Sequence, residues 1–177
     1  MVLMNKLLIL PLVSLFLLGC NVNNNLSPEE KAEKKLKTIL TVVENGVTFS
    51  VKTYTSTLEG GVKEKVDGYF NDAARVIDGL ITDGKIAPDV VDEYLKKHIN
   101  DNVPSPFDIA LTGALDLGLS GYNTFYAKNV KDNIANKEKA VRVLKAVVAG
   151  VESGLDPISG DVLDVNNPLE GYTDWEL

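Results

Sequence analysis

Apolar side chains recur at spacings of three and four residues along most of this chain, and that spacing most restricts its fold. An α-helix turns once about every 3.6 residues, so this spacing places the side chains on one face of a helix. The first stripe covers more than twenty residues and consists of Leu36, Leu40, Val43, Val47, Val51, Tyr54 and Leu58. It predicts one long amphipathic helix.

The same stretch also carries the signals of a β-hairpin, and this alternative stays open at the level of sequence. Asn45-Gly46 favours a tight two-residue turn, and Thr38–Thr57 is rich in β-branched residues, which strands prefer. The apolar stripe nevertheless keeps its helical phase through Asn45-Gly46. We therefore expect a helix here, with a hairpin as the second interpretation.

Four further segments show helical spacing of apolar residues, namely 62–81, 88–99, 105–126 and 137–154. The short, Gly-containing connections between them favour antiparallel neighbours. The predicted fold is therefore all-α. We expect a single bundle of four to five helices over residues 27–154, followed by an irregular acidic tail over residues 155–177.

Ser, Pro and Gly residues mark the expected helix boundaries. The sequence Ser-Pro-Glu-Glu at 27–30 combines a capping Ser, a Pro suited to the first helical position and a Glu at capping-box spacing. The sequence Ser-Pro-Phe-Asp at 105–108 repeats this pattern and predicts a second such start. Breaks are predicted at Gly60-Gly61 and Asp83-Gly84, a loop at Asn100–Pro104 and a C-terminal cap at Gly154.

The amino terminus has the composition of a secretory signal. Lys6 is the only charged residue among the first twenty, and a largely apolar run from Leu7 to Leu18 follows it. A run of this length is typical of the apolar region of a signal peptide and is short for a membrane span. Translation can start at Met1 or at Met4, and the second start gives the more typical opening Met-Asn-Lys.

The apolar run ends in Leu17-Leu18-Gly19-Cys20, which resembles the lipobox of bacterial lipoprotein precursors. The resemblance covers residues 1–20 only. In that family the Cys sulfur receives a diacylglycerol, a peptidase cuts before the Cys, and the new amino group is often acylated. The resemblance therefore implies removal of residues 1–19 and lipids on Cys20 as the only attached groups. Two or three acyl chains hold a protein on a membrane far better than one.

The resemblance also implies a place in the bacterial envelope. Asn21 follows Cys20, whereas Asp at that position resembles the signal that retains lipoproteins at the inner membrane of Gram-negative cells. We therefore expect the outer membrane, on the leaflet that faces the periplasm, with a Gram-positive plasma membrane as the alternative. Residues 20–26 are polar and rich in Asn, so they are expected to be a flexible tether between the lipid and the bundle.

Charge and the supply of reactive side chains exclude several classes of function. With 18 Lys and Arg against 25 Asp and Glu, the net charge is -7, which is unsuited to binding a nucleic-acid backbone. One His and one Cys cannot form a His-rich or Cys-rich metal site, and no catalytic Ser motif is present. We expect no catalytic residues, no metal and no nucleic-acid partner.

The segment 105–126 is rich in small residues for a helix. Each Gly inside a helix costs about 1 kcal/mol relative to Ala, which suggests that another backbone approaches closely. Tight packing of helices within the bundle is the favoured explanation. The other is a groove that binds a partner or an acyl chain, with Gly113, Gly118 and Gly121 as its candidate residues.

Residues 155–177 differ in character from the rest of the chain. They contain six acidic residues and no Lys or Arg, and Pro157 and Pro168 argue against a helix. Tyr172 and Trp175 are also present, and aromatic residues are common anchors in binding sites. We expect these two residues to cover an apolar groove of the bundle, and binding of a partner is the alternative.

Three classes of function remain. The first is a non-enzymatic, membrane-anchored binding or adaptor module of the envelope, whose partners are membrane lipid, through the anchor, and an envelope protein. In organisation it is similar to small helical lipoproteins that assist secretion channels and to phage lipoproteins that block superinfection. The second class is a carrier of lipid or another apolar ligand in a bundle groove. The third and least favoured is a cell-wall hydrolase.

Overall fold

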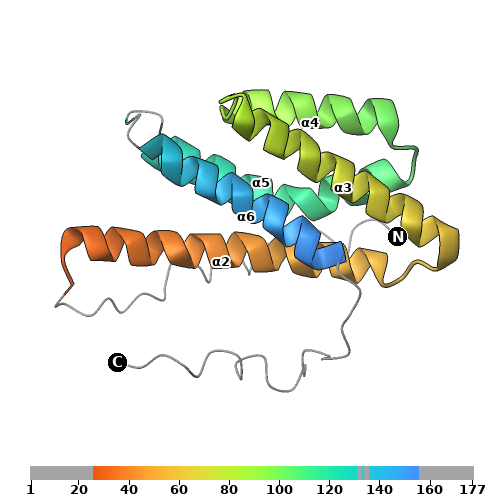
Figure 1. Ribbon diagram of the computed structural model, residues 1–177, viewed down its shortest axis with the longest axis horizontal. Coiled ribbons are helices and arrows are strands. Elements are labelled where there is room, and N and C mark those ends of the chain that lie inside the picture. Colours follow the sequence, from red (N-terminus) through yellow and green to blue (C-terminus); the bar gives the residue numbers. More distant parts are fainter. Residues whose placement is uncertain (1–25, 131–132, 134–135, 156–177) are drawn as a thin grey trace, which may run out of the picture. The chain divides into compact units, whose positions relative to one another are not determined.

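The computed structural model describes residues 26–130, 133 and 136–155. These residues form five α-helices and no strand, so the predicted all-α helical bundle is confirmed (Figure 1). The helices are α2 (Pro28–Thr55), α3 (Gly60–Thr82), α4 (Pro88–Asn102), α5 (Phe107–Asn129) and α6 (Lys137–Leu155). Helix α2 continues through Asn45-Gly46 without a break, which excludes the hairpin alternative.

The chain divides after Leu36 into two compact units. In the first unit, the described residues are the opening turns of α2, which begin with the predicted capping box. The backbone N–H of Glu30 donates to Ser27 Oγ over 3.2 Å, and the backbone N–H of Ser27 donates to Glu30 Oε2 over 2.7 Å. Because these hydrogen bonds favour the ionised carboxylate, they lower the pKa of Glu30.

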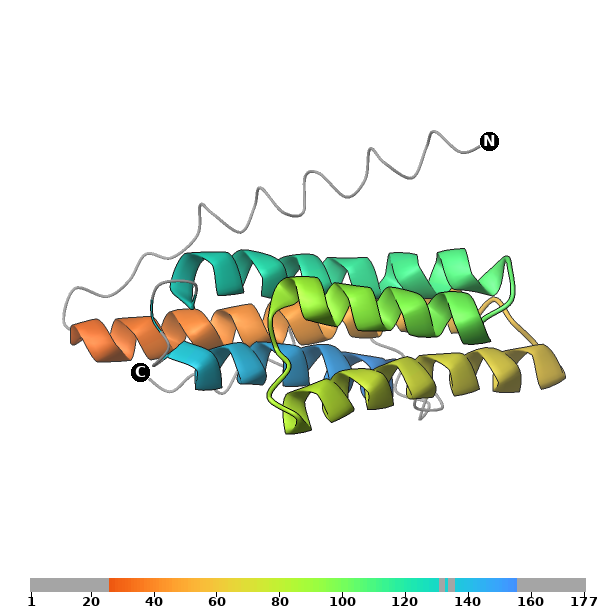
Figure 2. The ribbon, with the colours of Figure 1, turned by 90° about the horizontal axis from the view of Figure 1, so that it is seen from above.

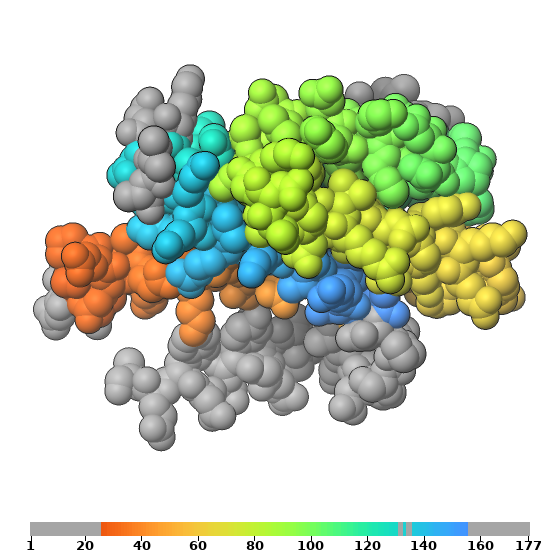
Figure 3. All heavy atoms as spheres, turned by 45° about the horizontal axis from the view of Figure 1, so that its top comes forward, coloured from red at the N-terminus to blue at the C-terminus, as the bar shows by residue number. Residues whose placement is uncertain are grey.

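In the second unit, α3, α4, α5 and α6 form a ring, and α3 and α5 also contact each other across it. Helix α3 contacts α4 and α6, and α5 also contacts α4 and α6. The part of α2 from Lys37 onward lies along α5 and α6 (Figures 1 and 2). Figure 3 shows α6, in blue, between α3 and α2. Helix α6 therefore has neighbours on several sides, and nine of its residues are buried.

Backbone contact between α2 and α6 brings these two helices very close together. A Cβ atom at Gly150 would lie 2.6 Å from the carbonyl oxygen of Glu44, and one at Gly154 would lie 2.6 Å from Val51 Cβ. The hydroxyl of Thr48 donates to the carbonyl oxygen of Gly150 over 3.1 Å, which joins the same two helices. Side chains larger than a hydrogen atom do not fit at either glycine.

A second connection ties the turn between α3 and α4 to α5. Tyr122 is fully buried, and its hydroxyl donates to the carbonyl oxygen of Ile86 in that turn. Burial disfavours the charged phenolate and raises the pKa of Tyr122. The turn itself follows Gly84, whose φ of 70° is the left-handed conformation that commonly ends a helix. The predicted break at Asp83-Gly84 is confirmed.

Several predicted helix boundaries are wrong. Gly60-Gly61 is not the break, because α2 ends at Thr55, before Leu58 of the predicted stripe, and Gly60 already begins α3. Helix α4 continues through the first three residues of the predicted loop and ends at Asn102. It ends there because Val103, which precedes a proline, is extended, with φ -112° and ψ 115°. Ser105 does not cap α5, because the helix begins only at Phe107 and Pro106, which has no side-chain acceptor, occupies the cap position.

Gly154 is not a helix cap, contrary to the prediction. It is a buried residue within α6, which continues to Leu155, and it faces Val51 of α2. A glycine near the end of an apolar stripe can either cap the helix or allow another helix to approach closely. The sequence of one helix does not show which backbone approaches it. The close approach of α2 explains why Gly is needed there.

The contact between α2 and α6 yields a prediction with a matched control. Gly150→Ala should lower the free energy of unfolding by about 1–3 kcal/mol, because the new methyl group meets a backbone oxygen that cannot move aside. Gly113→Ala should raise it by up to about 1 kcal/mol, because Gly113 is an exposed helical residue with open space around it. Urea unfolding monitored by far-ultraviolet circular dichroism measures both, and equal effects of the two substitutions would contradict the prediction.

Candidate functional site

The residues predicted to form a binding site do not come together in the described part of the chain. Cys20, Tyr172 and Trp175 lie outside the described residues. Gly118 and Gly121 lie on one face of α5, three residues apart. Gly113 lies five residues before Gly118, which places it about 140° away around the helix.

Neighbouring side chains fill the space beside Gly118 and Gly121. A Cβ atom at Gly118 would lie 2.5 Å from Val47 Cγ2 and 3.1 Å from Val147 Cγ2, and one at Gly121 would lie 3.0 Å from Val43 Cγ2. Tight packing against α2 and α6 therefore accounts for both glycines. Gly113 is exposed and has no such neighbour.

Sequence reasoning missed the glycines at which backbones approach most closely. Gly150 and Gly154 are four residues apart in α6, and they pack on Val47 and Val51, which are four residues apart in α2. The signal available in the sequence was that the glycine pair and the valine pair have the same spacing, which is typical of two helices in close contact.

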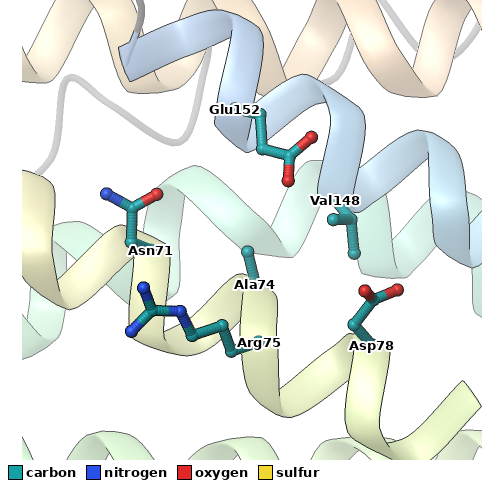
Figure 4. Close-up of a pocket in the computed structure, with 6 residues that line it drawn as sticks. All are labelled: Asn71, Ala74, Arg75, Asp78, Val148 and Glu152. Atoms are coloured by element: carbon teal, nitrogen blue, oxygen red, sulfur yellow. The ribbon is translucent and has the colours of Figure 1, made fainter. Parts of the chain in front are cut away.

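A small pocket lies between α3 and α6 and has a volume of about 180 Å³. Figure 4 shows its lining residues, which are Asn71, Ala74, Arg75 and Asp78 from α3 and Val148 and Glu152 from α6. The guanidinium of Arg75 lies 3.2 Å from Asp72 Oδ1, next to the pocket. Sites for small organic ligands usually measure about 300–1,000 Å³, so this pocket is small for such a ligand.

A polar cluster joins α4 and α5. Asn123 Nδ2 lies 3.5 Å from Asp92 Oδ2, and Asn123 Oδ1 is buried without a hydrogen-bond partner among the described residues. Burial raises the pKa of Asp116, while the charge of Lys96 lowers it and that of Asp92 raises it.

Among the residues that the structure describes, no three His, Cys, Asp or Glu side chains are grouped as metal ligands.

The most unusual surface in the described residues lies on α2. From Thr38 to Thr55, every exposed position is uncharged, although 24% of the chain is charged. These positions, together with the half-buried Val42, share one helical face, which we name the Phe49 face and which consists of Thr38, Val42, Asn45, Phe49 and Thr53.

Phe49 dominates this face. Its side chain is 72% exposed, which is more than that of any other large hydrophobic residue in the described part of the chain. The two charged residues of the same stretch, Glu44 and Lys52, are half-buried, and Glu44 lies about 140° away from Phe49 around the helix. An aromatic side chain surrounded by uncharged polar ones is typical of the centre of a protein–protein interface, where charged residues are depleted.

None of the helices that the structure describes is long and apolar enough to cross a bilayer. The exposed apolar side chains on the helices are few and separate, and Ile109 on α5 is the other one that is mostly exposed, at 70%.

The cluster between α4 and α5 yields a pH-dependent prediction. Because the pKa of Asp116 is raised in the folded state, ionisation of Asp116 above its ordinary pKa disfavours folding. Asp116→Asn should therefore increase the free energy of unfolding at about pH 7, by less than about 1 kcal/mol because solvent screens this partly exposed group. At about pH 3 the increase should vanish. Urea unfolding at both pH values tests this, and an increase that is the same at both would refute it.

No protein-family model, curated protein or solved structure matches this chain.

Proposed function

We propose that the chain is a non-enzymatic, lipid-anchored adaptor of the bacterial envelope, and that it binds a protein partner through the Phe49 face. The observation that carries this proposal is the 72% exposure of Phe49 on a helical face without exposed charges. Exposing a phenylalanine to water is unfavourable, since burying such a side chain contributes about 1.5–3 kcal/mol. A partner that covers Phe49 gains this free energy.

A carrier of lipid or another apolar ligand is the second candidate, and the packing of α5 favours it less. The carrier needs a groove beside the glycines of α5, and valine side chains of α2 and α6 fill the space at Gly118 and Gly121. The pocket between α3 and α6 is small and lined by charged groups. An apolar ligand finds a better surface at Phe49 than in either place.

The anchor in this proposal is Cys20, because Leu17-Leu18-Gly19-Cys20 resembles a lipobox. Helix α2 begins at Pro28, so seven residues separate Cys20 from the helix. Even fully extended, this tether spans roughly 30 Å. The adaptor therefore works close to the membrane, and Asn21 after the Cys favours the periplasmic leaflet of the outer membrane over the inner membrane.

The anchor is tested with Cys20→Ser. This variant should keep the far-ultraviolet circular dichroism and melting temperature of the folded protein, because residue 20 precedes α2. It should leave the membrane fraction of the cell, because it has no thiol to receive a diacylglycerol. Sedimentation of membranes from cells that produce either protein measures the difference. A Ser variant that still sediments with the outer membrane would show that Cys20 is not the anchor.

The partner surface is tested by replacing Phe49 with photoreactive p-benzoyl-phenylalanine in living cells. Illumination should yield one crosslinked product heavier than the chain alone, which contains an envelope protein. The matched control carries the same amino acid at Ile109, which is 70% exposed on α5. A product that forms equally from both positions, or from neither, would refute the Phe49 face as the partner surface.

A further inference from the structure

We propose that Lys31, Lys34 and Lys35, on the first turns of α2, bind an anionic phospholipid surface beside the point where the chain is anchored. We name these three residues the Lys31 face. The inference deepens the proposed function, because it rests on the Cys20 anchor to bring this face to a membrane. It adds a second contact with that membrane, which decides which side of these turns lies against the lipid.

The three lysines share one side of the helix, and the carboxylates of the same turns lie elsewhere. Lys34 and Lys35 follow Lys31 by three and four residues, so the three side chains lie on one face. Glu29 and Glu33 are each two residues from Lys31, which places them about 160° away around the helix. The lysines therefore present a cationic surface, although three glutamates balance them in the described part of the first unit.

The third carboxylate, that of Glu30, is held at the start of the helix. Its Oε2 accepts a hydrogen bond from the backbone N–H of Ser27 over 2.7 Å, and this bond lowers the pKa of Glu30. Lys31 and Lys35 form no ion pair with any residue in the described part of the chain. These two ammonium groups are therefore available to an anion outside the chain.

The described residues do not cover this part of α2. From Ser27 to Lys35 no residue is buried, and Lys34 and Lys35 are exposed. A helical segment that is polar on every side gains little from packing, so the capping box and the rest of α2 must keep these turns helical. The Lys31 face is therefore open to a binding partner.

The short tether keeps this face close to the membrane. Seven residues separate Cys20 from Pro28, where α2 begins, and they span roughly 30 Å at most. The Lys31 face follows Pro28 within the next two turns of the helix. A chain anchored at Cys20 therefore holds the three lysines beside the lipid headgroups.

Screening decides between attraction of the lysines and repulsion of the carboxylates. The net charge of the chain is -7, so an anionic membrane repels the chain as a whole. At physiological salt, however, a charge acts over only about 8 Å, whereas a helix with its side chains is about 10–12 Å wide. When the Lys31 face touches the membrane, Glu29 and Glu33 therefore lie beyond the range at which they are repelled.

The expected strength of this contact suits an anchored chain. Each lysine beside an anionic surface strengthens binding about fivefold, so three lysines strengthen it about 100-fold. This gain is too small to recruit a dissolved acidic chain to a membrane. It is large enough to orient a chain that a short tether already holds at the surface, because the tether makes the local concentration of lipid high.

Acetylation of lysines by a membrane-impermeant ester tests the proposal on vesicles of phosphatidylcholine, with or without an equal amount of phosphatidylglycerol. The chain is attached through Cys20, its only cysteine, either by its own lipids or by coupling the free thiol to a maleimide lipid. Mass spectrometry then gives the rate at each lysine. Lys34 and Lys35 should react at least about fivefold more slowly on the anionic vesicles, and high salt should abolish the difference. The exposed Lys65 and Lys96 should react equally on both.

Two variants show whether the lysines act together. Lys31→Gln combined with Lys35→Gln should make the rate at Lys34 equal on both kinds of vesicle. Glu29→Gln, on the opposite side of the helix, is the matched control and should leave the slow rate unchanged. None of the substituted residues is buried, so the variants should fold, and circular dichroism verifies this.

Four results would overturn the proposal. They are equal rates on both kinds of vesicle, equal slowing at the control lysines, slowing that persists in high salt, and slowing on isolated cell membranes without slowing on anionic vesicles. The last result means that an acidic protein, and not lipid, covers the Lys31 face. Because coupling at Cys20 works without natural lipids, a chain that cells do not lipidate would refute the proposed anchor and leave this measurement possible.

Discussion

The contact between the backbones of α2 and α6 is the constraint on which the second unit depends. Gly150 and Gly154 bring α6 so close to α2 that Val47 and Val51 lie directly on its backbone. The same Val47 also packs on Gly118 of α5, so one valine lies against two helices. Small core residues, mainly valine and glycine, therefore hold three helices together, and the larger Phe70, Ile77 and Tyr122 are buried elsewhere.

This close approach also determines which surface α2 presents. One face of the helix is occupied by valines that pack on α5 and α6, and the opposite face carries Phe49 among uncharged polar side chains. Of the nine charged residues of α2, seven lie between Glu29 and Lys37, before this face begins. The Thr38–Thr55 part of α2 is apolar on one side and has no exposed charge on the other, so it has two surfaces suited to contact, and the fold itself uses only one of them.

Much of the fold could be predicted from the sequence, because apolar spacing reports the face of each helix. The stripe from Leu36 to Leu58 kept its phase through Asn45-Gly46, and α2 is continuous there. The candidate site could be predicted far less well. Helical spacing shows that a glycine lies on a face, but it does not show which neighbour approaches, so the sequence predicts a cap at Gly154 and leaves a groove at Gly113 open as the alternative to tight packing. Phe49 belongs to none of the apolar stripes in the sequence. Its exposure becomes unusual only when the structure shows how deeply the other apolar residues of α2 are buried.

The hydrogen bond from Tyr122 to the carbonyl oxygen of Ile86 has a consequence for how the bundle opens. Helices α3 and α4 form a pair joined by a short turn, and such a pair often separates from a bundle as one unit. Here the hydrogen bond joins the turn to α5, although Tyr122 is 36 residues away from Ile86 in the chain. Opening the pair therefore exposes a tyrosine hydroxyl and a carbonyl together with the apolar core, and the local fluctuations of the turn are coupled to global unfolding.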